Sequence, residues 1–168
     1  MTPQFLKTVP GENPVITEAD FSASPARLFK AWTEPDEIRA WFGGGPGRVT
    51  DAVIELRIGG AWRFSFNDEP GIINALRGEY LEIVPNRRLV FSWVHQKSDQ
   101  GGALEETATS QVTVEIVPNG TGARMTIRHE GIVRESGRFG VSEGWSYGLS
   151  SLIAMLKNEQ LQSEGVSS

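Results

Sequence analysis

The feature that most constrains this chain is a change of hydrophobic period toward its C-terminus. From about residue 49 to residue 130, apolar and polar residues alternate as they do in half-buried strands. After Gly137 to Gly140 the spacing becomes helical, with one apolar face. That face carries Trp145, Leu149, Leu152, Ile153 and Leu156. An apolar helix face must cover an apolar surface, so the pattern predicts a sheet closed by one long C-terminal helix.

Two short helices are predicted ahead of the main run of strands. Val15 to Phe21 alternates as a first strand, and Ser24 followed by Pro25 is typical of a helix N-cap and first helical residue. Pro35 ends that helix or begins the next, and the run from Gly43 to Gly47 stops the second one.

The remaining segments predict an antiparallel meander, because short alternating runs are separated by turn residues. The expected strands are Val49 to Leu56, Ala61 to Asn67, Ile73 to Val84, Arg88 to His95, Gln111 to Val117 and Ala123 to Glu130. The polar segment from Gln96 to Ala108 is expected to be an exposed, mobile hairpin tip. We therefore predict an α+β fold with a curved antiparallel sheet of about six or seven strands. Residues 14–162 form the single domain, between a flexible arm (1–13) and a disordered tail (163–168).

Composition excludes several classes of site and partner. The chain has no Cys, so it has neither disulfides nor thiolate metal ligands, and its two His residues lack metal-ligand spacing. Its net charge is -5 and its basic residues are scattered, which disfavours nucleic acid as a partner. No stretch approaches the length of a membrane span or a secretory signal. We expect a cytoplasmic protein without metal or cofactor and without membrane insertion.

Aromatic residues dominate the faces predicted to point inward, including all five Trp residues. A curved sheet closed by one helix leaves space along its concave side, and apolar pockets of that kind hold small molecules. The expected ligand-binding residues are Trp62, Phe64, Tyr80, Phe91, Trp93, His129, Trp145 and Leu149.

The sequence shows no recognisable catalytic constellation, and two residues are weak candidates. His129 alternates in phase with Met125 and Ile127, which puts it on an inner face where it either carries a proton or is a core histidine with a local hydrogen bond. The core interpretation is favoured, and His95 lies near a strand end. Glu79 could face inward beside Tyr80 and act as an acid or base, although strand carboxylates more often face solvent.

Several local stretches occur in an order known from one superfamily. They are Phe21 to Thr33, Trp41-Phe42, Gly59 to Phe64, Gly78 to Pro85, Arg88 to Trp93 and Gly144-Trp145. Together they cover about Val15 to Leu156, and the chain resembles bacterial proteins similar to the activator of heat-shock-protein-90 ATPase, within the START-like (SRPBCC) superfamily. The resemblance implies the helix-grip fold, also called START-like or Bet v 1-like.

The resemblance implies fold more securely than activity, because its relatives include co-chaperone domains, polyketide cyclases and lipid-binding proteins. Our leading hypothesis is binding of a hydrophobic or aromatic small molecule in an internal cavity. The alternatives are a cyclase-, aromatase- or hydrolase-like enzyme using the same cavity, and a stress-related co-chaperone or protein-interaction module. The eukaryotic activator grips its chaperone through an additional N-terminal domain, and nothing resembling that domain precedes Val15. Exposed helices and edge strands are compatible with a homodimer.

Overall fold

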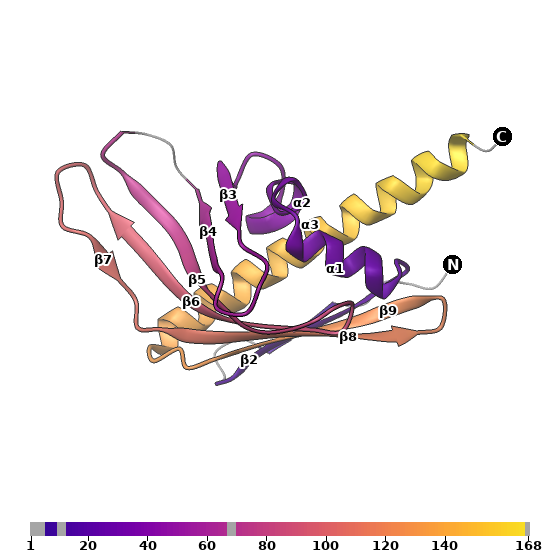
Figure 1. The fold of residues 1–168 in the computed structure, drawn as a ribbon, viewed down its shortest axis with the longest axis horizontal. Helices are drawn as coiled ribbons and strands as arrows, with labels where there is room; N and C mark the ends of the chain where they lie inside the picture. Colours follow the sequence, from indigo (N-terminus) through magenta and orange to yellow (C-terminus); the bar gives the residue numbers. More distant parts are fainter. Residues whose placement is uncertain (1–5, 10–12, 67–69, 167–168) are drawn as a thin grey trace.

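The computed structural model describes residues 6–9, 13–66 and 70–166, which form one curved antiparallel sheet with a long helix across its concave side (Figure 1). The strands are β1 (Leu6–Val9), β2 (Val15–Phe21), β3 (Asp51–Ile54), β4 (Ala61–Ser65), β5 (Ile73–Val84), β6 (Arg88–Ser98), β7 (Glu105–Glu106), β8 (Ser110–Asn119) and β9 (Gly122–Glu130). The helices are α1 (Pro25–Thr33), α2 (Pro35–Trp41), the 3-10 turn η1 (Phe42–Gly44) and α3 (Glu135–Val166). This is the α+β helix-grip architecture.

The strand order within the sheet is β1-β2-β9-β8-β6-β5-β4-β3, and β7 pairs with the outer part of β6. The expected ranges of β2 and β5 are confirmed at both ends. In β2 every second side chain is buried, which is the alternation that the sequence shows. The twofold pattern therefore predicts these strands and the faces that they bury.

The two short helices form for the local reasons expected. The Ser24 hydroxyl accepts a hydrogen bond from the Arg27 backbone N–H at 3.1 Å, which caps α1 behind Pro25. The indole of Trp41 at the end of α2 donates to the Ala31 carbonyl at 2.9 Å. Both helices lie over one half of the concave face of the sheet (Figure 1).

Several boundaries differ from those expected. Leu6–Val9, placed in a flexible arm, forms β1 and pairs with β2. The expected mobile tip contains the last residues of β6 and all of β7. The helix α3 begins at Glu135 and continues to Val166, so it takes in the Gly137–Gly140 segment and part of the expected tail. These glycines are helical despite their low helix propensity.

The core lies between α3, the short helices and the sheet. Trp145, Leu149, Leu152 and Leu156 are at most 3% exposed, and Ile153 is partly buried. The apolar stripe of α3 therefore covers the sheet, as its spacing predicts.

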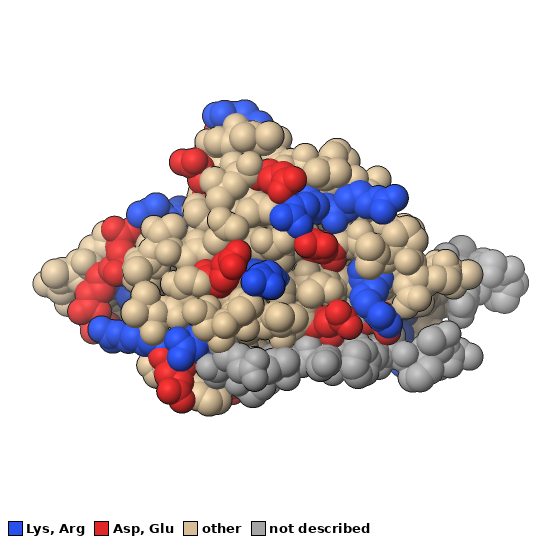
Figure 2. Space-filling view, turned by 90° about the horizontal axis from the view of Figure 1, so that it is seen from below, with Lys and Arg blue, Asp and Glu red and all other residues tan. Residues whose placement is uncertain are grey.

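The outer face of the sheet carries interleaved acidic and basic side chains (Figure 2). Arg124 pairs with Asp20 at 2.7 Å, and Arg88 pairs with Glu115 at 2.6 Å. Among the helices in the described ranges, none is long and apolar enough to cross a membrane.

Candidate functional site

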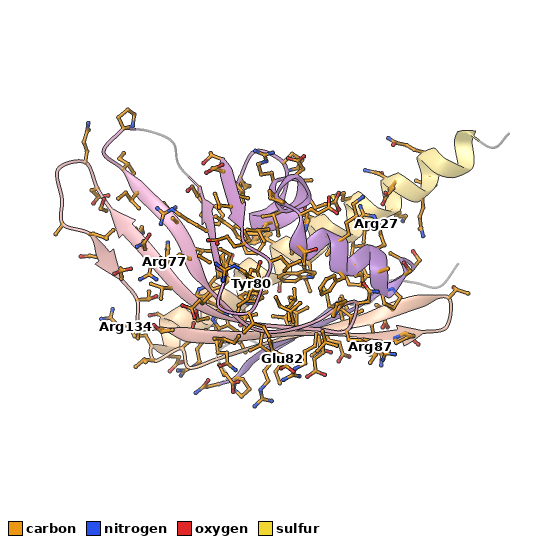
Figure 3. The ribbon with its side chains drawn as sticks, in the orientation of Figure 1. Arg27, Arg77, Tyr80, Glu82, Arg87 and Arg134 are labelled. Atoms are coloured by element: carbon orange, nitrogen blue, oxygen red, sulfur yellow. The ribbon has the colours of Figure 1, made fainter. Side chains whose placement is uncertain are left out.

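A cavity of about 1200 Å³ lies between the first half of α3, η1 and the outer parts of β5, β6 and β7. Its exposed lining residues Glu105, Val133 and Arg134 mark the mouth, and Figure 3 shows Arg134 at the end of the molecule where α3 begins. Pockets that hold drug-sized ligands are typically about 300 to 1000 Å³ and are mostly apolar. The cavity is therefore large enough for a ligand with several rings.

Five aromatic rings form the inner wall of this cavity: Trp41, Phe42, Phe66, Trp93 and Trp145. The ring centroids of Trp93 and Trp145 are 5.3 Å apart, and those of Phe42 and Trp145 are 5.8 Å apart. Packed rings of this kind are rigid. Trp41, Phe42 and Trp145 are at most 4% exposed, and Phe66 and Trp93 are partly exposed. The wall is thus an apolar, aromatic side of the cavity.

A row of glycines on α3 forms the opposite wall. Gly137, Gly140, Gly144 and Gly148 are three or four residues apart, which places them on one helix face, and all four line the cavity. A Cβ atom added at Gly140 or Gly144 would meet no heavy atom within 4 Å. At Gly148 it would lie 3.5 Å from the Trp41 ring. The cavity thus occupies the space that a row of side chains on α3 would otherwise fill.

The cavity has a polar end formed by β5, β6 and β7. The His95 Nε2 atom lies 2.7 Å from the Asn74 Oδ1 atom, and both residues line the cavity. Thr107 on the neighbouring segment accepts a hydrogen bond from the His95 backbone N–H at 3.0 Å. Burial, and secondarily the charge of Lys97, lowers the pKa of His95 below its ordinary value of 6.5. The imidazole is therefore neutral at pH 7.

His129 lies behind the aromatic wall and is fully buried. The Trp145 indole N–H donates to its Nδ1 atom at 3.2 Å, so the ring proton is on Nε2, which lies 2.7 Å from the Ser110 hydroxyl. That hydroxyl in turn donates to the Trp93 carbonyl at 3.4 Å. Burial lowers the pKa of His129 to about 3. This is the satisfied core histidine of the favoured interpretation.

The carboxylate expected beside Tyr80 and two other strand or turn carboxylates lie outside the cavity. Glu79 is exposed, and Glu82 pairs with Arg88 at 2.8 Å on the outer side of the sheet (Figure 3). Glu55 pairs with Arg57 at 3.1 Å, also on the surface. None of these carboxylates lines the cavity, so the structure does not place an inward acid beside Tyr80.

The eight expected ligand-binding residues divide into three groups. Trp93 and Trp145 line the cavity. Trp62, Phe64, Tyr80 and Phe91 instead surround a space of about 10 Å³ under the short helices, together with Trp32 and Leu89. That space holds about one water at most, so this half of the concave face is filled core. His129 and Leu149 are also core residues and do not line the cavity.

Sequence reasoning missed most of the cavity lining. The position of His95 near a strand end disfavours it as a site residue, yet it is the histidine on the cavity wall. Phe42 and Phe66 were not included, although they flank the glycine-rich turn and β4. The glycine row on α3 was the available signal, because four glycines on one helix face leave that face without side chains.

Among the described residues, no group of three or more His, Asp or Glu side chains is arranged to hold a metal ion. The polar groups of the cavity wall are suited to hydrogen bonding with an organic ligand.

Comparison with known families gives one match over most of the chain. Residues 22–157 match the family model described as activator of Hsp90 ATPase homolog 1-like protein. A comparison with curated proteins finds no match.

Comparison with solved structures finds the same fold in several proteins. A protein from Rhodobacter sphaeroides is 24% identical with a TM-score of 0.71, and the match covers 92% of this chain and 99% of that one. A protein from Rhizobium loti is 26% identical with a TM-score of 0.66, over 91% of this chain and 99% of that one. DynU16, a protein of the dynemicin biosynthetic locus, is 19% identical with a TM-score of 0.67, over 87% of this chain and 48% of that one.

Proposed function

Because the chain belongs to the family of activator of Hsp90 ATPase homolog 1-like proteins, within the START-like superfamily, we propose that it binds a hydrophobic or aromatic small molecule in the cavity beside α3. The observation that carries the proposal is the cavity itself: about 1200 Å³ between five aromatic rings and a helix face of glycines. A folded core normally closes such a volume, because empty space forfeits packing energy.

The size of the ligand follows from the contact that it must make. Burial contributes roughly 25 cal/mol per Å², so a two-ring compound burying about 200 Å² gains about 5 kcal/mol before the cost of association. Micromolar affinity needs about 8 kcal/mol. A natural ligand with such an affinity therefore has more than two rings, or adds hydrogen bonds at the polar end of the cavity.

The test is a thermal-unfolding titration with a panel of aromatic compounds of two to four rings. A ligand that binds only the folded state raises Tm as its concentration increases. At 100 times its Kd it adds about 2.7 kcal/mol to the free energy of unfolding. Native mass spectrometry of the freshly purified protein checks in parallel for a co-purifying small molecule. The proposal fails if no compound of the panel raises Tm and no additional mass accompanies the protein.

The enzymatic alternative ranks second for a structural reason. The two side chains expected to carry a proton, His129 and Glu79, do not line the cavity. A reaction in the cavity would have to use other groups, of which His95 is the titratable side chain nearest to the aromatic wall along β6. The predicted cytoplasmic location and the co-chaperone alternative stay predictions.

A further inference from the structure

The Asn74–His95 pair leaves one ring nitrogen available to a ligand. An amide oxygen only accepts hydrogen bonds, so the Asn74 Oδ1 atom at 2.7 Å fixes the proton of the neutral His95 ring on Nε2. The Nδ1 atom then carries a lone pair. None of the described residues donates a hydrogen bond to this Nδ1 atom. His129 differs in this respect, because both of its ring nitrogens have partners.

Charged side chains lie around the neutral His95 ring at the polar end of the cavity. On β6, Lys97 follows two residues later on the same face and lies opposite Glu105 of β7. Glu106 is bound by Arg77 at 2.7 Å and by Gln96 at 2.9 Å. Arg134 lies across the mouth, before α3.

The side-chain oxygen atoms of Asn74 and Thr107 each already form a hydrogen bond. The Asn74 Oδ1 atom binds the His95 ring, and the Thr107 hydroxyl accepts from the His95 backbone N–H. A ligand that fills the apolar part of the cavity therefore meets His95 as the neutral group able to accept a hydrogen bond.

We propose that His95 Nδ1 accepts a hydrogen bond from a hydroxyl group of the bound ligand, so that the cavity selects hydroxylated aromatic compounds over their unsubstituted or methylated counterparts. This inference rests on the proposed function and names the class of its ligand. Its physical basis is that a ligand without a donor leaves the buried acceptor unpaired. A pocket built around a hydrogen bond rejects analogues that cannot form it.

The test compares three probes of similar size: 2-naphthol, naphthalene and 2-methoxynaphthalene. Their affinities are measured at pH 7.5 by quenching of tryptophan fluorescence, since three Trp rings line the cavity. One hydrogen bond predicts about 3- to 10-fold tighter binding of 2-naphthol than of the other two. The methoxy compound keeps the oxygen but has no proton to donate.

Two variants assign the preference to His95. His95→Phe keeps a flat ring without an acceptor and is expected to bind all three probes equally. His95→Asn offers an amide oxygen near the position of Nδ1 and is expected to keep part of the preference.

The outcomes separate this inference from the proposed function. If 2-naphthol does not bind the wild-type protein, the inference is overturned, and the panel of two- to four-ring compounds decides the proposed function separately. If all three bind the wild-type protein equally, or if His95→Phe still prefers 2-naphthol, the inference is overturned while ligand binding stands. The comparison of probes in the wild-type protein decides the matter even where a variant fails to fold.

Discussion

Replacing Gly144 by leucine tests whether the cavity beside α3 is the binding site. Gly144 lines the cavity, and a Cβ atom built on it would meet no heavy atom within 4 Å. The added Cβ atom therefore fits without displacing the backbone, and the rest of the leucine side chain is expected to extend into the cavity. The substitution removes space for a ligand and leaves the rest of the fold in place.

The expected effects on stability and on affinity have opposite signs. Glycine is about 1 kcal/mol less favourable in a helix than a good helix former, so Gly144→Leu is expected to raise Tm by about 2 to 4 °C in a domain of this size. A ligand that loses about 60 Å² of apolar contact to the new side chain loses about 1.5 kcal/mol, which is about tenfold in Kd.

The assay is a pair of titrations with naphthalene, one followed by tryptophan fluorescence and one by thermal unfolding. Ser150→Leu is the matched control, because Ser150 is exposed on the same helix and does not line the cavity. The control should bind naphthalene as the wild type does. If Gly144→Leu folds stably and still binds naphthalene with wild-type affinity, the ligand does not occupy this cavity.

Three further predictions concern the packing that surrounds the site. Gly78→Ala should destabilise the protein by about 3 kcal/mol, measured by urea unfolding, because its Cβ atom would lie 1.8 Å from the Ser92 carbonyl oxygen; an unchanged midpoint would contradict this close approach. Leu149→Ala should cost about 2 to 5 kcal/mol, whereas Tyr147→Ala, at a residue 60% exposed, should cost less than about 0.5 kcal/mol; equal losses would refute the assigned helix faces. Burial lowers the pKa of His129 from 6.5 to about 3, so below pH 6.5 the unfolded chain binds one proton more than the folded chain. The free energy of unfolding should therefore fall by about 1.4 kcal/mol for each unit by which the pH drops from 6.5 toward 3. His129→Gln should flatten this slope, and an unchanged slope would show that His129 is not buried in its neutral form.

The sequence predicts which faces of the strands are buried, because alternation is a local property. On β6, Leu89 and Phe91 are buried, and Trp93 and His95 follow on the same face. Alternation does not say how far along a strand the covering helices reach. In the structure Trp32 of α1 packs near Phe91, and the part of the face near His95 borders the cavity.

The position of the cavity depends on α3 as well, through residues that carry no hydrophobic signal. The apolar stripe from Trp145 onward predicts that this helix packs on the sheet. The glycines before and within it predict a helix boundary instead, because glycine is a poor helix former. Their common function on one helix face becomes visible only when the helix is seen to begin at Glu135.

The most direct test of the binding site is a set of intermolecular NOEs between naphthalene and the methyl groups of the protein. We predict NOEs to Leu76, Ile132 and Val141, which line the cavity, and none to Leu28 and Leu152, which are buried away from it. NOEs confined to surface methyl groups, or to Leu28 and Leu152, would contradict the account.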